Sequence, residues 1–252
     1  MSITVWVGVV LLTLALALAP ALSSSPYPCI PDLYSFELLV ATKLLLLDCD
    51  STLSSIEGID ELGRLRGPET FKAVEDMTNA AMDGGTPMEA IFAKRLDIIK
   101  PTKAELEVIG AQYIATVEPT AKATLDQLHA AGWKIAIVSG GFTQAILPLA
   151  AYLGIDRVEA VILRFHADGT YAGFDESCPT CRSKGKNVIA LRLRAEHQAT
   201  HVVMVGDGAS DLEVKGDADK VIGFGRYAVR AKVKAGADAF IMSLAELPGV
   251  VG

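Results

Sequence analysis

Short, unbroken apolar runs recur along the chain and constrain its fold more than any other feature. The first run, Leu44–Leu47, ends directly at Asp48. A strand with one wet face alternates apolar and polar residues, whereas an unbroken run of this length is typical of a strand buried on both faces. Similar runs follow at 134–139, 158–163, 201–207, 220–224 and 239–242.

Helical patterns separate most of these runs. They cover residues 120–132, 143–154, 187–197 and 226–236. Alternation of strands and helices predicts an α/β fold with a doubly wound parallel sheet, which is a Rossmann-like core. The segment 164–174 differs, because its Asp168–Gly169 pair between two short runs predicts a β-hairpin.

One long stretch, from Gly58 to about Val117, carries helical patterns and no clear strand. It follows the first strand directly, so it has the position of an insertion. We expect it to form a small helical cap over the carboxyl edge of the sheet, where open α/β sheets bind ligands. The predicted domains are a core of residues 26–56 and 119–252 and a cap of residues 57–118.

The first residues form a segment with its own composition. Residues 3–22 carry no charge, and the first basic residue is Lys43. As a helix, a segment of this length would reach about 30 Å, which is enough to cross a bilayer. Residues 1–25 are therefore predicted to target or anchor the chain, with membrane contact through residues 3–22. A signal cleaved after Ala19 or Ala21 and a mispredicted start are the alternatives, and residues 23–31 are predicted to be a linker.

Charge and cysteine content exclude some classes of protein. The net charge is −7 and no basic run is present, which argues against nucleic acid as a partner. Cys29, Cys49, Cys178 and Cys181 are too few for a disulfide framework in a chain of 252 residues. The Cys178–Cys181 pair lacks the second pair that a zinc site would need.

Side chains that can do chemistry gather at the ends of the predicted strands. Asp48 and Asp50 are two residues apart, so in an extended chain both carboxylates can face one site. Later segments add a serine with two glycines, a lysine before a helix, and two further acids. These residues are Ser139, Gly140, Gly141, Lys186, Asp207 and Asp211.

This set of groups suits phosphoryl transfer, because a phosphate monoester resists attack by another anion unless a site supplies a cation and donors. We expect Asp48 to attack phosphorus and Asp50 to protonate the leaving oxygen and then activate water. Mg²⁺ prefers hard oxygen ligands, so it is expected on Asp48, Asp50 and Asp207, with a backbone carbonyl among its ligands. Ser139, a glycine N–H and Lys186 would bind the phosphoryl oxygens.

The four motifs DCDST, SGG, Lys186 and GDGASD resemble those of the haloacid dehalogenase superfamily. Longer segments, among them EGIDELGRL, MTNAAMDGGTP, KRLDIIKPT, YAGFDE and IGFGRYAVR, are similar to the phosphoserine phosphatases of that superfamily. The resemblance runs from about Leu44 to the C-terminus and includes the cap. It implies a magnesium-dependent phosphatase that releases L-serine and phosphate from phosphoserine, the last step of serine biosynthesis.

Carried over by position, the resemblance also implies a substrate pocket in the cap. Glu57 would meet the substrate amino group and Arg95 its carboxylate, with Asp211 as a supporting acid. The pocket would be completed by Met82, Met88, Ser210 and Arg230. From the residues alone, a helix-dipole acid, a solvated arginine and core methionines are the commoner interpretations. Family members often have an aromatic residue at position 88 and Gly-Gly where this chain has Lys184–Gly185.

Other functions remain open at this stage. A related capped phosphatase would act on another small phosphomonoester, a phosphotransferase would pass the phosphoryl group to an acceptor hydroxyl, and a membrane-tethered binding protein would have a decayed site. The expected partner is a small phosphomonoester, and a homodimer is left open. The function implies the cytoplasm or a plastid, whereas residues 3–22 point to a membrane or a secretory route.

Overall fold

The computed structural model describes residues 42–83 and 87–252, except for the side chain of Met88. The predicted targeting segment, the linker at 23–31, the membrane contact at 3–22 and Cys29 all lie outside the described residues. Within the described ranges, no helix is both long enough and apolar enough to span a membrane.

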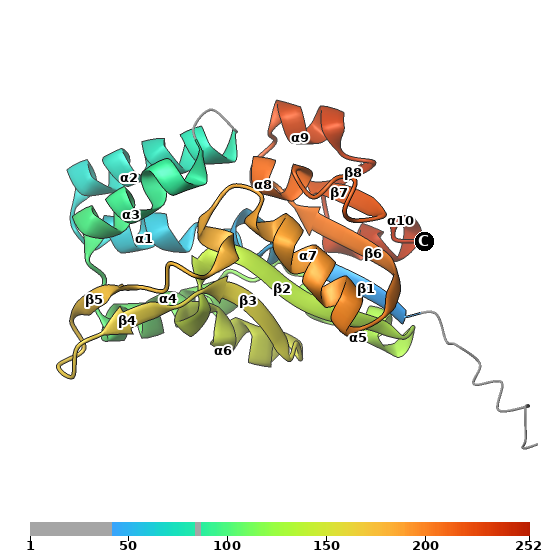
Figure 1. Cartoon of the computed structure of the whole chain (residues 1–252), viewed down its shortest axis with the longest axis horizontal. Helices are drawn as coiled ribbons and strands as arrows, with labels where there is room; N and C mark the ends of the chain where they lie inside the picture. The colour runs from blue at the N-terminus through green and yellow to red at the C-terminus, as the bar shows by residue number, and fades with distance from the viewer. Residues whose placement is uncertain (1–41, 84–86) are drawn as a thin grey trace, which may run out of the picture. The chain divides into compact units, whose positions relative to one another are not determined.

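A six-stranded parallel sheet forms the centre of the fold, in the order β3-β2-β1-β6-β7-β8 (Figure 1). This confirms the predicted doubly wound core. The strands are β1 (Thr42–Leu47), β2 (Trp133–Phe142), β3 (Arg157–Val161), β6 (Ala199–Gly206), β7 (Lys220–Phe224) and β8 (Ala239–Ile241).

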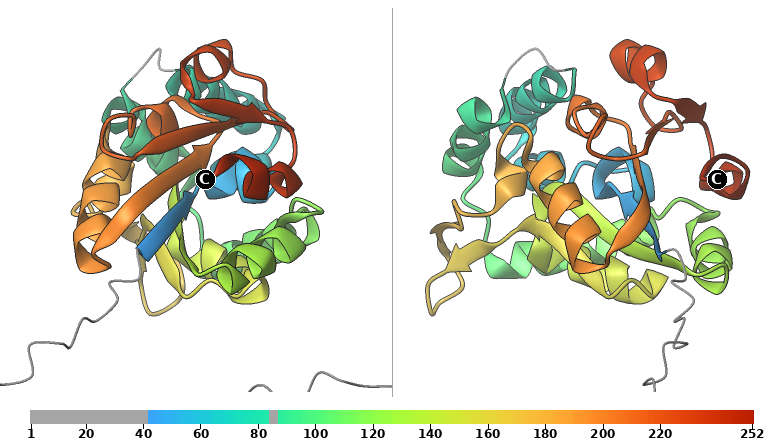
Figure 2. Two further views of the ribbon diagram at one scale, coloured as in Figure 1. Left: turned by 90° about the vertical axis from the view of Figure 1, so that its right-hand side faces the viewer. Right: turned by 45° about the vertical axis from the view of Figure 1, so that its right-hand side comes forward.

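Helices cover both faces of this sheet, with α7 on one side and α5 and α6 on the other (Figure 2). The covering helices are α4 (Lys103–Ala115), α5 (Ala121–Ala130), α6 (Thr143–Leu153) and α7 (Gly185–Glu196). In β1, Leu45 and Leu47 join the core beneath α4, α5 and α6. Leu44 and Leu46 join the core beneath α7. All four leucines are fully buried, which explains the unbroken apolar run.

The strand order reverses at β1, which pairs with β2 on one side and with β6 on the other. Leu47 is level with Ile137 of β2 and with Val205 of β6, so the three strands reach the carboxyl edge together. A crevice opens where the order of a parallel sheet reverses. Asp48, Ser139 and Asp207 come one or two residues after these three positions, and they therefore lie close together.

The segment after β1 is helical, as the sequence predicts. It comprises a tight turn, η1 (Cys49–Leu53), then α1 (Gly58–Arg64), α2 (Pro68–Met82), α3 (Met88–Ile99) and α4. The first three of these helices pack on one another, whereas α4 packs along α6 of the core. The division into a core and a cap at residues 57–118 stays a prediction.

The remaining elements include one confirmed prediction and one that is partly wrong. β4 (Leu163–Phe165) and β5 (Tyr171–Phe174) form the predicted antiparallel hairpin. The helix predicted over 226–236 begins only at Ala231, as α9 (Ala231–Gly236). The residues before it are not helical: the Tyr227 ring packs on Phe224, and Arg230 is extended. The short elements are η2 (Pro179–Cys181), α8 (Ala209–Leu212), η3 (Leu244–Glu246) and α10 (Leu247–Val250).

Candidate active site

The chain turns sharply as it leaves β1. The Asp48 N–H still donates to the Val205 carbonyl at 2.9 Å, so the sheet holds this residue in place. Ser51 adopts a left-handed conformation, with φ of 50°, which is uncommon for a residue other than glycine. This conformation reverses the chain, and the Ser51 hydroxyl donates to Glu57 Oε1 at 2.6 Å. The turn thus joins the predicted nucleophile to the predicted amino-group ligand.

Lys186 lies between two buried carboxylates. Its Nζ is 2.9 Å from Asp48 Oδ1 and 2.7 Å from Asp211 Oδ1. Burial lowers the pKa of Lys186, but Asp211 and Asp48 more than offset this effect and hold the pKa above its usual value. The lysine is therefore a permanent cation beside Asp48.

Lys184, two residues earlier, has a different position. It is exposed, it precedes α7 in a left-handed conformation, and its backbone N–H donates to Glu213 Oε2 at 2.7 Å. Only one of the two lysines therefore faces the carboxylates. Glycine adopts a left-handed conformation with less strain than lysine does. This difference is a physical reason for the Gly-Gly that related sequences have where this chain has Lys184–Gly185.

The Asp50 carboxylate is held by three donors. Oδ1 accepts from the Gly58 N–H at 2.7 Å and from the Tyr113 hydroxyl at 2.6 Å. Oδ2 accepts from Ser139 Oγ at 3.2 Å. Burial and the charge of Asp48 raise the pKa of Asp50, although the three hydrogen bonds oppose the rise. A carboxyl group with a raised pKa can carry a proton to a leaving group.

Three buried acids, Asp48 among them, converge in the site. Oxygens of Asp48, Asp207 and Asp211 lie within 4.8 Å of one another. Burial and the charges of Asp48 and Asp211 raise the pKa of Asp207. Asp207 Oδ1 is buried and has no hydrogen-bond partner among the described residues. Like charges packed this closely require a cation, and the orphaned oxygen marks where one would bind.

The second part of the site is the carboxyl-terminal end of β2, residues Ser139 to Gly141. The Ser139 hydroxyl accepts from the Gly141 N–H at 2.9 Å, which fixes its orientation. Ser139 is fully buried, and Gly140 and Gly141 line a cavity of about 220 Å³. The same cavity is lined by several of the other predicted site residues, which are Asp48, Asp50, Glu57, Met82, Arg95, Lys186 and Ser210.

Arg95 reaches the cavity from α3 and is 4% exposed. Its Nη1 donates to Thr78 Oγ1 of α2 at 2.9 Å, and the Thr78 hydroxyl donates to Asp60 of α1. Burial raises the pKa of Asp60 to about 6, although Thr78 and Arg95 oppose the rise. Three helices therefore hold one guanidinium at the cavity wall.

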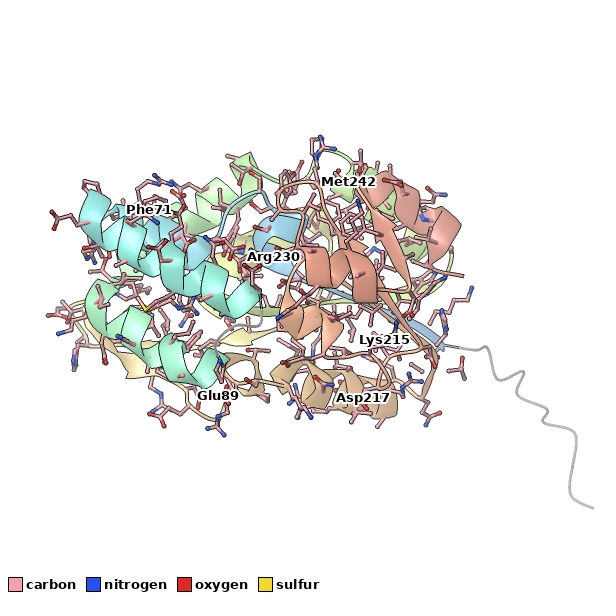
Figure 3. The ribbon with its side chains drawn as sticks, turned by 90° about the horizontal axis from the view of Figure 1, so that it is seen from above. Phe71, Glu89, Lys215, Asp217, Arg230 and Met242 are labelled. Atoms are coloured by element: carbon pink, nitrogen blue, oxygen red, sulfur yellow. The ribbon has the colours of Figure 1, made fainter. Side chains whose placement is uncertain are left out.

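Arg230 and Glu89 are among the residues that join the inserted helices to the core. Arg230, which is labelled in Figure 3, pairs with Asp207 at 3.2 Å and with Asp83, at the end of α2, at 3.0 Å. Glu89, at the start of α3, accepts from the Ser183 N–H at 2.9 Å. The cavity lining described by the structure does not include Arg230, and the side chain of Met88 lies outside the described atoms, so their substrate roles stay predictions.

Sequence reasoning missed several residues of this site. Tyr113 lies outside every quoted motif, and Thr78 lies within the segment MTNAAMDGGTP but was assigned no role. Both reach the site through helix packing. Four polar residues also line the cavity without having been predicted, and they are Thr180, Arg182, Ser183 and Glu213. The closeness of Arg182 and Ser183 to Lys186 in the sequence was the one signal that could have found some of them. Cys178 and Cys181, which flank Thr180 in the sequence, are free thiols.

Comparison with known proteins places this geometry in a family. A family profile of haloacid dehalogenase-like hydrolases matches residues 42–214. The phosphoserine phosphatase of Bos taurus is 35% identical over 216 residues, which cover 85% of this chain and 95% of that protein. The chloroplastic phosphoserine phosphatase of Arabidopsis thaliana is 35% identical over 222 residues, covering 86% of this chain and 75% of that protein.

Solved structures agree with the sequence comparison. A substrate-bound phosphoserine phosphatase has a TM-score of 0.74 and 28% identity, covering 84% of this chain and 99% of that one. A phospho-aspartyl intermediate analogue of phosphoserine phosphatase has a TM-score of 0.74 and 29% identity, covering 84% and 100%. The chain therefore belongs to the haloacid dehalogenase-like hydrolases and, within them, to the phosphoserine phosphatase family.

Proposed function

We propose that the protein hydrolyses O-phospho-L-serine to L-serine and phosphate through a covalent aspartyl-phosphate on Asp48. The observation that carries the proposal is a single cavity lined by a carboxylate nucleophile, a buried lysine and two further groups of opposite charge, Glu57 and Arg95. Phosphoserine has a phosphate, an ammonium and a carboxylate within a few ångströms. The cavity offers a complementary group for each.

The electrostatics of the cavity favour an ammonium group near Glu57. Burial raises the pKa of Glu57, and the carboxylates of Asp50 and Asp207 raise it further. A substrate cation at this place would relieve that repulsion and restore the charge of Glu57. The Ser51 hydroxyl holds Oε1, which leaves the acid oriented for the substrate.

The carboxylate of the substrate would bind Arg95. A guanidinium can hold a carboxylate with two parallel hydrogen bonds, and this one is restrained by Thr78. A substrate without a carboxylate cannot form these hydrogen bonds and would gain no binding energy from Arg95. The site should therefore discriminate strongly between phosphoserine and phosphoethanolamine.

Arg95→Ala tests the substrate assignment. We expect kcat/KM for phosphoserine to fall about 100-fold, as for loss of a charged hydrogen bond, and kcat/KM for phosphoethanolamine to change little. Arg182→Ala is the matched control, because this arginine lines the same cavity but is exposed and donates to the Glu176 carbonyl. Both substrates are assayed by phosphate release. Equal losses on both substrates would exclude Arg95 as the carboxylate ligand.

The chemistry would proceed in two displacements. Asp48 attacks phosphorus as the bond to the serine oxygen breaks, and Asp50 delivers its proton to that oxygen. A water molecule then loses a proton to Asp50 and attacks phosphorus, and the bond to Asp48 breaks. Lys186, Ser139 and the backbone N–H groups after it would stabilise the charge on the phosphoryl oxygens.

The donor set fits Mg²⁺, which is a hard cation that takes oxygen ligands. Asp48 and Asp207 would hold the ion, with Asp207 Oδ1 supplying the orphaned oxygen. The Asp50 carboxylate is occupied by its three donors, so Asp50 would contribute its backbone carbonyl. Asp211 is bonded to Lys186 and to the Gly208 N–H, which suits a supporting role. When bound, Mg²⁺ supplies charge neutralisation of the phosphoryl group.

Removal of divalent cations should silence the enzyme. We expect EDTA to abolish phosphate release and added Mg²⁺ to restore it. Asp207→Asn should shift the Mg²⁺ concentration for half-maximal activity upward by at least about tenfold, because a charged ligand is lost. Asp156→Asn, at an exposed position before β3, should leave the titration unchanged. Full activity in EDTA would rule out the cation requirement.

A further inference from the structure

Tyr113 makes a contact that no motif of the sequence predicts. It lies on α4, the helix that packs along α6, and it is fully buried. Its hydroxyl donates to Asp50 Oδ1 at 2.6 Å across 63 residues of sequence. A buried tyrosine hydroxyl needs a hydrogen-bond partner. Here that partner is the predicted acid and base of the reaction.

The two oxygens of Asp50 have different environments. Oδ1 already accepts two hydrogen bonds, from Tyr113 of α4 and from the Gly58 N–H of α1. Oδ2 is next to the end of β2, where Ser139 Oγ is 3.2 Å away and a Cβ on Gly141 would lie 2.8 Å away. A proton on the carboxyl group is therefore directed to Oδ2, the oxygen on the phosphate-binding side.

Gly58 leaves the room that this arrangement needs. A Cβ at this position would lie 2.1 Å from the Tyr113 hydroxyl oxygen and 2.9 Å from the ring carbon that carries it. The backbone of Gly58 is not left-handed, so close approach alone requires glycine here. The first residue of α1 and the tyrosine of α4 are thus fitted to one another around Asp50.

We propose that Tyr113 is a positioning residue that saturates Asp50 Oδ1 and so presents Oδ2 to the leaving oxygen and, later, to the attacking water. The inference rests on the proposed role of Asp50 and adds a residue to it. Tyr113 does not touch substrate. It acts by holding the carboxyl group in one orientation, so that the proton leaves from, and returns to, the same oxygen.

Tyr113→Phe tests the inference because it keeps the buried ring and removes only the hydroxyl. With phosphoserine, we expect kcat to fall about tenfold, as for loss of one hydrogen bond to a charged group, with KM changed by less than about twofold. With 4-nitrophenyl phosphate, the burst of nitrophenolate should keep its rate, because this leaving group needs no proton. A purely structural tyrosine would slow both reactions alike.

Two further variants make the test specific. Tyr171→Phe is the matched control, since this half-buried tyrosine on β5 lies outside the described cavity lining, and it should behave as wild type. Gly58→Ala should impair the wild-type background by displacing the Tyr113 hydroxyl. The same change should cost clearly less in the Tyr113→Phe background, where that oxygen is gone. Thermal melting of each variant verifies that it is folded.

Asp50→Asn separates this inference from the proposed function. If Asp50→Asn turns over phosphoserine as wild type does, the proposed mechanism itself fails. If Asp50→Asn stalls the reaction while Tyr113→Phe matches wild type, or loses equally on both substrates, only the positioning role is overturned. A stalled Asp50→Asn together with a loss in Tyr113→Phe that depends on the leaving group supports both.

Discussion

Asp48→Asn is expected to abolish turnover, with kcat falling on the order of 10⁴-fold or more. The amide keeps the size of the carboxylate and can still accept from the Cys49 N–H, which donates to Asp48 Oδ1 at 2.8 Å. It cannot form the acyl phosphate that the first displacement requires. Phosphate release from phosphoserine measures the loss, and acid-quenched samples should contain no phosphoenzyme.

The loss in Asp48→Asn must be distinguished from misfolding. Asp126→Asn makes the same chemical change at an exposed position on α5, and it should leave kcat unchanged. A melting temperature of Asp48→Asn near that of wild type would show that the fold is intact. Wild-type turnover by a folded Asp48→Asn protein would refute the covalent mechanism.

Lys186→Met should lower kcat/KM for phosphoserine by about 10²–10³-fold, the effect of removing one preorganised charge-stabilising group. Methionine fills a similar volume but leaves Asp48 and Asp211 without the cation that lies 2.9 Å and 2.7 Å away. Breaking a buried ion pair destabilises a fold by about 3–5 kcal/mol, so the melting temperature should also fall. Kinetics are therefore measured well below the melting temperature.

Lys184→Ala is the control for this lysine. The side chain is exposed, and the contact with Glu213 is made by the backbone N–H, which alanine retains. We expect kcat/KM to stay within about twofold of wild type. A larger loss in Lys184→Ala than in Lys186→Met would show that Lys184, and not Lys186, binds the phosphate.

The sequence predicts the sheet well because each strand carries its own signal. Leu44–Leu47 is buried on both faces, and its pattern alone says so. The acids at the strand ends are also predictable, because parallel strands end at one edge. The start of α9 at Ala231 was missed, because Arg230 is held by Asp207 and Asp83, and neither partner is visible in the local pattern.

The residues that support the site are less accessible to sequence reasoning. Thr78 reaches Arg95 from a neighbouring helix, and Tyr113 reaches Asp50 from α4. Each looks like an ordinary helical residue, since its role depends on which helices pack together. The side-chain oxygens of Asp50 likewise turn to Gly58, Tyr113 and Ser139, which the spacing of the two acids does not reveal.

The pairing of β1 with β6 has a consequence for how the protein acquires activity during folding. Leu47 lies beside Val205, so the chain must close a loop of about 158 residues before Asp48 and Asp207 meet. Closure of such a loop is entropically costly and is rewarded only when both strands are buried, so distant pairings of this kind form slowly. A nascent chain that ends before β6 contains Asp48 and the helices around it but lacks Asp207 and Asp211. We therefore expect activity only once the chain extends past β6 to Asp207 and Asp211.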